Sequence, residues 1–359
     1  MSAFISLLAV GTALPPHLVW QSEAAAFAMR HFGERLAKHR QLLSIFPNTR
    51  IAKRHFVVPL SWFETPQHSL KERNDLYVRT AEALSLAAAR EALARAQVMP
   101  EEVDFVVFVS TTGLATPSLD ARLIECLGMR RTTRRVPVWG LGCAGGVAGL
   151  ARAAEFTAAY SGSTALVVAV ETSSLTFQFH DYSKKNFVAS ALFADGAAAA
   201  VISSNPARRG RLRYIGSHSM LFPNSAHVMG WDVVDTGFSV VFAPEIPARI
   251  ARDLKPVVSA CLAEHRQPSD AVRYYALHPG GARVLEAYAE ALDLTDEDLR
   301  AARDVLREHG NMSSPTVLFV LERLLREPAL EPGALMLMGA LGPGFSAELA
   351  LFQVQEAAS

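Results

Sequence analysis

The sequence predicts an α/β protein built from two similar halves, and three observations support this class. Short apolar runs typical of buried strands alternate with longer helical stretches. The order of these elements in the first half of the chain recurs in the second half. Half of the 359 residues are hydrophobic and only 19% are charged, so the chain can bury a large core and is long enough for two domains.

The first half begins with an apolar strand and a strongly amphipathic helix. Asn74 and Asp75 precede that helix as candidate N-caps. The segment 111–118 is rich in Thr, Gly and Pro, and it is predicted to be a loop. In chain order the predicted elements are a strand over 5–10, a helix over 76–98, a strand over 103–110, a helix over 119–129, a strand over 136–140, a glycine-rich turn into a helix over 141–156, and a strand over 165–171.

A polar segment over 203–211 separates the halves, which we place at 1–205 and 206–359. The second half repeats the order with a first strand over 212–217, a strand YYALH over 274–278 and an apolar helix over 311–325. Each half is predicted to end in a glycine-rich hairpin, LFADGAAAAVIS in the first and GALGPGFSAELALF in the second. This correspondence places Cys143 and Asn311 at equivalent helix N-termini, with His278 at a strand end beside them.

Composition excludes several functional classes. The 35 Lys and Arg residues equal the 35 Asp and Glu residues, so there is no basic excess for nucleic-acid binding. Three cysteines cannot form a disulfide framework, and they suit a reducing cytoplasm, where we place the protein. No Lys or Arg precedes Arg30, so the first apolar run reads as a strand rather than a signal peptide. The apolar segment 332–354 is interrupted by glycines, Pro343 and Glu348, so we expect no stable membrane insertion.

The turn after the strand over 136–140 carries a GxGxxG pattern at Gly140, Gly142 and Gly145. With Glu171 at the end of the next strand, this pattern is compatible with a dinucleotide site and an NAD-dependent oxidoreductase. The pattern lies far from the start of the domain, and Glu171 is further away than the usual spacing of about 20 residues. Cys143 also projects from the turn at the place where a phosphate should bind.

The same turn fits cysteine chemistry. A thiol at a helix N-terminus meets the positive end of the helix dipole, which favours the thiolate. Glycine neighbours leave room for a carbonyl substrate next to Cys143. Cys126 and Cys261 lie in apolar helical stretches and are predicted to be buried core thiols.

Two further residues complete a possible catalytic set. His278 ends an apolar strand and is followed by Pro-Gly-Gly, which suits a catalytic imidazole as well as a structural one. Asn311 begins a predicted helix and is compatible with a plain N-cap. Together with Cys143 they form a Cys–His–Asn set, in which the imidazole pairs with the thiol and the amide stabilises an oxyanion.

These residues lie in motifs that run through the whole chain: GTALPP, VSTTGLATPS, GLGCAGG, ALFADGAAAAV, LHPGG, GNMSSPTVLFVLE and GPGFSAE. The chain resembles the type III polyketide synthases of the chalcone synthase-like group, which belong to the thiolase-like condensing enzymes. The resemblance implies a homodimer of the layered αβαβα fold, with a buried cavity that a CoA tunnel reaches. It makes Cys143 the nucleophile and His278 and Asn311 its partners.

The resemblance also assigns roles around the cavity. Phe193 matches an aromatic gatekeeper between tunnel and cavity, and Val240 stands where a second gatekeeping Phe is usual, which should widen the cavity. The family's basic residues for the CoA phosphates are not matched, because Ser44 and Asn48 stand at two of those places. Cavity-lining positions fall on Thr111, Thr176, Gly230 and Ser313, the position that reaches the partner subunit's cavity falls on Thr116, and the nearby basic candidates for CoA are Arg50, Lys53 and Arg54.

The implied reaction is the iterative decarboxylative condensation of malonyl-CoA onto an acyl-CoA starter. It needs no metal or redox cofactor, and CoA thioesters enter only as substrates. The small side chains near the cavity favour a long-chain fatty acyl-CoA starter and an alkylpyrone or alkylresorcinol product. An aryl-CoA starter, or malonyl-CoA alone giving a phloroglucinol or tetrahydroxynaphthalene, stays open. A papain-like hydrolase lacks its usual Cys signature here, and a non-catalytic protein of this fold would be expected to have lost one of the three residues.

Overall fold

The computed structural model describes residues 4–36, 44–65, 68–268, 270–327 and 330–356. The helices are α1 (Gln21–Leu36), α2 (Ile45–Asn48), α3 (Leu70–Ala96), α4 (Leu119–Leu127), α5 (Gly145–Ala159), α6 (Lys184–Leu192), α7 (Ile246–Glu264), α8 (Ala282–Leu292), α9 (Arg300–His309) and α10 (Thr316–Arg326). The strands are β1 (Ser6–Ala13), β2 (His17–Trp20), β3 (Lys53–Phe56), β4 (Phe105–Val109), β5 (Arg134–Val138), β6 (Thr164–Thr172), β7 (Asp195–Ser203), β8 (Leu212–Leu221), β9 (Met229–Val234), β10 (Gly237–Phe242), β11 (Val272–Leu277), β12 (Leu335–Gly342) and β13 (Ser346–Val354).

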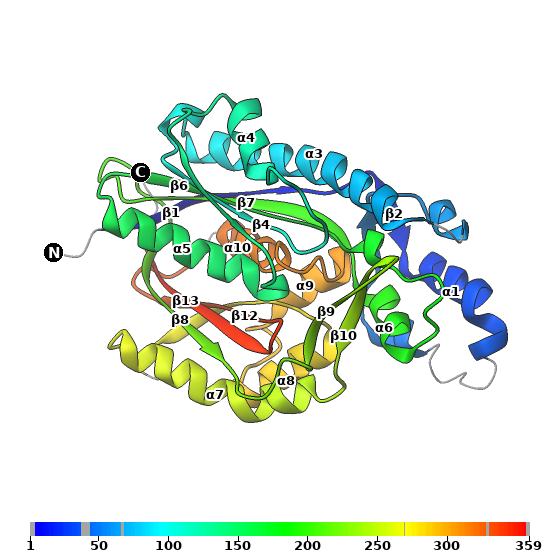
Figure 1. Ribbon diagram of the computed structural model, residues 1–359. Coiled ribbons are helices and arrows are strands. Elements are labelled where there is room, and N and C mark those ends of the chain that lie inside the picture. Colours follow the sequence, from blue (N-terminus) through cyan, green and yellow to red (C-terminus); the bar gives the residue numbers. More distant parts are fainter. Residues whose placement is uncertain (1–3, 37–43, 66–67, 269, 328–329, 357–359) are drawn as a thin grey trace.

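The elements form five layers, α–β–α–β–α. Figure 1 shows α3 and α4 on one outer face, α7 and α8 on the opposite outer face, and α5 and α10 between the strands of the two halves. Both central helices pack against strands from each half. The predicted layered fold is therefore observed, with the two central helices buried between the sheet layers.

Nine strands pair in one continuous order, β11-β12-β13-β8-β1-β7-β6-β4-β5, while β9 pairs with β10 and β2 pairs with β3 in two separate two-stranded sheets. Counted outwards from the β1–β8 pair, both halves show the same pairing. In the first half, β1 pairs antiparallel with β7, β7 antiparallel with β6, and β6 parallel with β4. In the second half, β8 pairs antiparallel with β13, β13 antiparallel with β12, and β12 parallel with β11. The repeated order of elements predicted from the sequence is thus present in the sheet. The assignment of 1–205 and 206–359 as separate domains stays a prediction.

The long amphipathic helix begins earlier than predicted. Its first residue is Leu70, and Ser69 caps it through a capping box with Glu72. The polar first turns hid this start, because the apolar periodicity begins only later. Asn74 is not a cap; its amide instead exchanges two hydrogen bonds with the backbone of Leu114.

The two central helices approach each other closely at Gly146. A Cβ atom at this position would lie 2.3 Å from the carbonyl oxygen of Ser314, so only glycine fits. This contact brings the turn that holds Cys143 next to the segment that precedes α10.

Three predictions about local structure were wrong. The segment LFADGAAAAVIS is not a hairpin, because its residues 195–203 form the single strand β7 between β1 and β6. Asn311 does not begin a helix, since α10 starts at Thr316 with Pro315 as N-cap. Cys126 is exposed on α4 rather than buried, whereas Cys261 is buried as predicted.

The segment 332–354 does form two strands, β12 and β13, around a short turn, as predicted. Within the described residues, no helix combines the length and apolar character of a membrane-spanning segment.

Candidate active site

Cys143 lies in the turn between β5 and α5. Gly140 and Gly142 have positive φ angles of 94° and 44°, which turn the chain sharply after the strand. A single 3-10 turn over Gly142–Ala144 carries Cys143 and leads directly into α5. The Cys143 Sγ donates to the Ser313 Oγ at 3.5 Å. The predicted position of the thiol at a helix N-terminus is therefore observed.

His278 follows β11, as the sequence predicted. Its backbone N–H donates to the carbonyl oxygen of Gly339 at 2.9 Å, which extends the sheet by one residue. The side chain is 2% exposed, and neither ring nitrogen has a hydrogen-bond partner among the described residues. Buried polar atoms without a partner are rare in folded proteins, so this imidazole is available to a bound molecule.

Asn311 is held by backbone and side chain together. Its N–H donates to the Leu192 carbonyl at 3.0 Å, and its own carbonyl accepts from the Ala194 N–H at 2.9 Å. The side-chain Oδ1 accepts from the Ser313 N–H at 2.8 Å, and Nδ2 donates to the Gly280 carbonyl at 3.1 Å. These bonds fix the orientation of the amide, and Nδ2 keeps a second N–H for another acceptor.

The three residues line one pocket, which we call the catalytic pocket. Its other walls are mainly apolar, from the β9–β10 hairpin, α7 and α8. The lining residues are Gly142, Cys143, Phe193, Met229, Gly230, Trp231, Val240, Val241, Phe242, Ile246, Ile250, His278, Gly280, Val284, Tyr288, Asn311, Ser313, Leu341 and Pro343. A thiol, an imidazole and an oriented amide thus meet in an apolar site, which suits acyl transfer through a thioester.

Burial controls the protonation of this site. It raises the pKa of Cys143 to about 11 and lowers the pKa of His278 to about 3. The expectation that the helix dipole alone would favour the thiolate is therefore wrong, because desolvation outweighs it. A proton that moves from Sγ to the imidazole creates both charges together, and their attraction in the apolar pocket offsets part of this cost.

Glu171 is fully buried behind the catalytic pocket. Its carboxylate accepts hydrogen bonds from the Thr111 N–H (2.9 Å), Thr111 Oγ1 (3.1 Å), Thr112 Oγ1 (2.8 Å) and Ser314 Oγ (2.7 Å). Burial nevertheless raises the pKa of Glu171 to about 7. A carboxylate so enclosed cannot bind a ribose, so the dinucleotide interpretation of the glycine-rich turn is wrong.

Glu171→Gln should destabilise the protein. The amide NH₂ that replaces one carboxylate oxygen cannot accept from the donors that meet it, so buried hydroxyl or N–H groups lose their acceptor. We expect the free energy of unfolding in urea to fall by about 1–3 kcal/mol.

The matched control is Glu297→Gln, which alters a carboxylate that pairs with Arg300 at the surface with 76% of its side chain exposed. That change should alter stability by less than about 0.5 kcal/mol. Equal midpoints of urea unfolding for Glu171→Gln and the unmodified protein would contradict the hydrogen bonds assigned to the Glu171 carboxylate.

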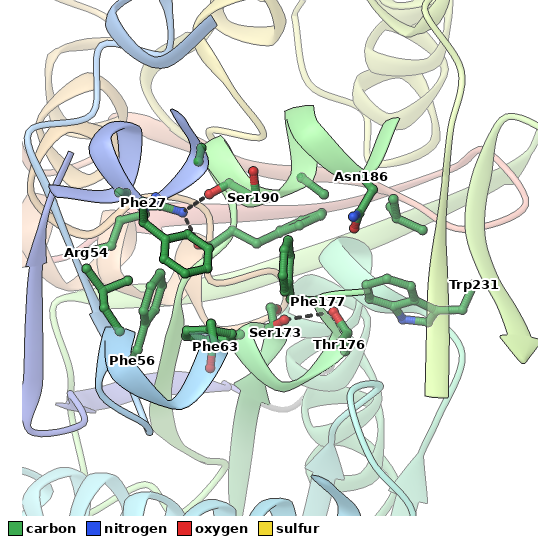
Figure 2. Close-up of a pocket in the computed structure, with 17 residues that line it drawn as sticks. Phe27, Arg54, Phe56, Phe63, Ser173, Thr176, Phe177, Asn186, Ser190 and Trp231 are labelled. Atoms are coloured by element: carbon green, nitrogen blue, oxygen red, sulfur yellow. Dashed lines mark hydrogen bonds between the residues drawn. The ribbon is translucent and has the colours of Figure 1, made fainter. Parts of the chain in front are cut away.

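A second pocket adjoins the catalytic pocket, and we call it the side chamber. Figure 2 shows aromatic side chains from α1, β3 and the segment around Phe177 gathered around it. Phe193, Trp231 and Val240 line both pockets, so they form the boundary between them. The side chamber is lined by Ala24, Phe27, Ala28, Arg54, Phe56, Leu60, Phe63, Ser173, Ser174, Thr176, Phe177, Asn186, Ala189, Ser190, Phe193, Trp231 and Val240.

Three of the five other residues predicted around the cavity line one of these two pockets, and two line neither. Gly230 and Ser313 line the catalytic pocket, whereas Thr176 lines the side chamber. Thr116 is exposed in the loop between β4 and α4. Thr111 does not line either pocket; this prediction was wrong, because its hydroxyl is directed to Glu171.

The three basic candidates for CoA do not form one exposed cluster. Arg50 is exposed and pairs with Glu286 of α8 at 3.2 Å, and Lys53 is half-buried at the start of β3. Arg54 is 1% exposed, and burial lowers its pKa to about 9 despite the nearby charge of Asp195. Arg54 is therefore not the phosphate contact that we predicted, because β3 directs it into the interior.

Two wall residues escaped the sequence prediction. Trp231 contributes to both pockets, and Tyr288 is a fully buried phenol in the catalytic pocket. Val284 and Tyr288 are four residues apart on α8, so helical spacing downstream of His278 could have placed them on one face. Among the described residues, no group of three or more His, Cys, Asp or Glu side chains could hold a metal ion.

Comparison with known proteins identifies the family. Residues 2–206 match the family model "Chalcone and stilbene synthases, N-terminal domain", and residues 215–354 match the corresponding C-terminal domain model. The chain belongs to this family, the type III polyketide synthases, and is therefore an acyl-transferring condensing enzyme.

Relatives in bacteria cover nearly the whole chain. A chalcone synthase-like protein of Bacillus subtilis (strain 168) is 41% identical over 98% of this chain and 99% of its own length. The 1,3,6,8-tetrahydroxynaphthalene synthase of Streptomyces peucetius subsp. caesius is 36% identical, over 97% of this chain and 93% of its own length.

Solved structures agree with this assignment. The 1,3,6,8-tetrahydroxynaphthalene synthase from Streptomyces coelicolor A3(2) superimposes with a TM-score of 0.93 at 33% identity, covering 98% of this chain and 100% of that one. PKS-I from the brown alga Ectocarpus siliculosus gives a TM-score of 0.92 at 28% identity, covering 99% of both chains. The thiolase-like fold predicted from the sequence is confirmed.

Proposed function

We propose that this polyketide synthase extends a long-chain fatty acyl-CoA starter with malonyl-CoA and cyclises the product to an alkylpyrone or alkylresorcinol. The observation that carries this proposal is the side chamber. It adjoins the pocket of Cys143, His278 and Asn311, and aromatic rings form much of its wall. An alkyl chain attached at Cys143 can extend past the boundary residues into this apolar space.

The first step loads the starter. The Sγ of Cys143 attacks the thioester carbonyl while its proton passes to His278. The tetrahedral oxyanion accepts hydrogen bonds from the His278 imidazole and from the second N–H of Asn311 Nδ2. The C–S bond to CoA then breaks, the CoA thiolate takes up a proton, and the acyl group stays on Sγ.

The second step forms a carbon–carbon bond. Malonyl-CoA loses its carboxylate as CO₂, and the electron pair of the broken bond forms an enolate that His278 and Asn311 stabilise. The apolar walls disfavour the charged carboxylate and so assist this loss. The enolate carbon attacks the acyl carbonyl and expels the Cys143 thiolate, which releases a β-ketoacyl-CoA. Transfer of this chain back to Sγ starts the next cycle.

Closing the boundary between the two pockets should select against long starters. Val240→Phe places a ring between the catalytic pocket and the side chamber. We expect kcat/KM for a long-chain acyl-CoA to fall about tenfold or more, with acetyl-CoA changed less than about twofold. Steady-state kinetics with a graded series of acyl-CoA starters measures this difference.

Val233→Phe is the matched control, since Val233 lies on the same β-hairpin and is 67% exposed. It should leave the starter preference unchanged. An equal fall of kcat/KM for all starters in Val240→Phe would show that the alkyl chain does not pass this residue.

Substrate binding and assembly complete the proposal. The CoA phosphates bind near Arg50 and Lys53, which are accessible, and no further cofactor takes part. Two chains associate around Thr116, where Leu114, Val136 and Trp139 expose large apolar side chains. Light scattering that gave the mass of a single chain would exclude this homodimer.

A second candidate is priming by malonyl-CoA alone. The names of the relatives from Streptomyces favour it, because those proteins are tetrahydroxynaphthalene synthases. Mass spectrometry of products separates the two candidates. A tetrahydroxynaphthalene or phloroglucinol made from malonyl-CoA alone supports the second, whereas products that incorporate an added fatty acyl-CoA support the first.

A further inference from the structure

Arg54 is a buried cation next to the catalytic pocket for which the proposed reaction has no direct use. It lies on β3 and is 1% exposed. Its Nε and Nη2 have no hydrogen-bond partner among the described residues. Since burying a charge with few partners is costly, its retention needs a reason beyond stability.

The remaining nitrogen of Arg54 binds two carbonyl groups at the end of α6. Nη1 donates to the Ser190 carbonyl at 2.8 Å and to the Phe193 carbonyl at 2.7 Å. Figure 2 shows these bonds at the edge of the side chamber, beside Phe27. Arg54 therefore fixes the backbone on both sides of Leu192.

The segment that Arg54 fixes is the one that holds Asn311. Phe193 and Asn311 form an isolated parallel bridge, in which Leu192 accepts from the Asn311 N–H and Ala194 donates to the Asn311 carbonyl. On the other side, the stem of Arg54 packs on Gly310. A Cβ atom on Gly310 would lie 2.7 Å from the Arg54 Cγ, and Gly310 has a positive φ of 71°. Arg54 thus touches both strands of the bridge.

The nearest acid does not share this role. The Asp195 carboxylate accepts from the Val57 N–H at 2.8 Å, from the Ser174 N–H at 2.7 Å and from the Ser174 hydroxyl. It compensates the charge of Arg54 at longer range but forms no ion pair with it within the described residues. The hydrogen bonds of Arg54 are therefore directed to the bridge and to the helix end that leads into it.

We propose that Arg54 is a positioning residue, which acts through the Phe193–Asn311 bridge to hold the Asn311 amide toward the reacting oxygen and the Phe193 ring at the boundary of the side chamber. This inference rests on the proposed function of Asn311 in stabilising the enolate. Cys143 is held in the glycine-rich turn between β5 and α5, to which Arg54 makes no hydrogen bond, and only the bond of its Sγ to Ser313 links it to the Asn311 side chain. Loss of Arg54 should therefore impair the steps that need Asn311 more than the reactivity of the thiol.

The test uses Arg54→Met and Arg54→Lys in the full-length protein. Release of labelled CO₂ from malonyl-CoA reports on Asn311, and the rate of Cys143 alkylation by iodoacetamide reports on the thiol. We expect Arg54→Met to lower kcat for decarboxylation about 10- to 100-fold, because small displacements of catalytic groups have effects of this size. KM and the alkylation rate should change by less than about twofold. Arg54→Lys keeps the charge and can reach one carbonyl, so it should restore part of kcat.

Arg73→Met is the matched control. Arg73 is also buried, and its Nη1 donates to two backbone carbonyls, those of Leu175 (2.8 Å) and Phe177 (2.6 Å). Its hydrogen bonds reach neither strand of the bridge. Its loss should lower the urea midpoint as much as the loss of Arg54 does, and it should leave kcat for decarboxylation within about twofold.

Two results would overturn the inference. One is an Arg54→Met protein with unchanged kcat. The other is a loss of decarboxylation in Arg54→Met that is matched by an equal loss of alkylation, or that Arg73→Met shows to the same extent. If Arg54→Met does not fold, the same comparison is made with Arg54→Lys: kcat for decarboxylation should fall while the rate of Cys143 alkylation stays unchanged. An unmodified protein that releases no CO₂ from malonyl-CoA contradicts the proposed function instead, so the two failures are distinguishable.

Discussion

Cys143→Ala should leave no detectable polyketide product, while malonyl-CoA still loses CO₂. Without Sγ there is no atom to carry the acyl chain between extensions, so each cycle stops before the carbon–carbon bond forms. Removing the nucleophile of a concerted catalytic set costs a factor of about 10⁴ or more in turnover. In the proposed mechanism decarboxylation needs His278 and Asn311, and we expect both to keep their positions when the half-buried thiol is replaced by a methyl group. Product analysis and labelled CO₂ release measure the two activities separately.

Cys126→Ala is the control for this prediction, because Cys126 is an exposed thiol on α4. It should retain both activities. Product formation by Cys143→Ala, or its loss in Cys126→Ala, would show that another residue carries the chain.

His278→Ala should suppress decarboxylation and change the pH dependence of the thiol. Loss of a donor to the developing oxyanion costs about 10²- to 10³-fold in turnover. With the imidazole absent, the Cys143 proton can leave only to solvent, and burial holds the pKa of that thiol near 11. A raised thiol pKa means that the thiolate forms only at high pH. The rate of alkylation by iodoacetamide should therefore be low at neutral pH and rise steadily toward pH 11.

In the unmodified protein the proposed mechanism has the imidazole accept the proton, so we expect the profile to rise at lower pH than in His278→Ala. His218→Ala is the control, since His218 pairs with Glu264 on α7 and lies outside the catalytic pocket. Identical profiles for His278→Ala and the unmodified protein would show that His278 does not pair with the thiol.

The sequence was sufficient to predict which three side chains converge. Cys143 lies in a glycine-rich turn before a helix and His278 lies at the end of a strand before two glycines, and the repeated order of elements places both at the same centre. These sequence features are local and regular, so they predict positions that tertiary packing does not change. Asn311 was placed in the correct region for an incorrect reason, because it sits in a strand-like bridge and not at a helix start.

The remaining features depend on tertiary surroundings. Desolvation cannot be measured from sequence, so the helix position alone favoured the thiolate at Cys143, whereas burial disfavours it. In the sequence Arg54 is one of three neighbouring basic residues and nothing sets it apart. In the structure, the alternation of side chains along β3 turns Arg54 inward and leaves Lys53 accessible. Trp231 becomes a wall residue only when the β9–β10 hairpin folds over the pocket.

Peptide mass spectrometry shows directly whether Cys143 carries the growing chain. The protein is incubated with a long-chain acyl-CoA, quenched in acid, digested and examined by peptide mass spectrometry. The proposed function predicts an acyl group on the peptide that contains Cys143, followed by loss of this adduct and appearance of an alkyl-substituted product when malonyl-CoA is added. An acyl group on any other residue, or an adduct on Cys143 that malonyl-CoA does not consume, would contradict it.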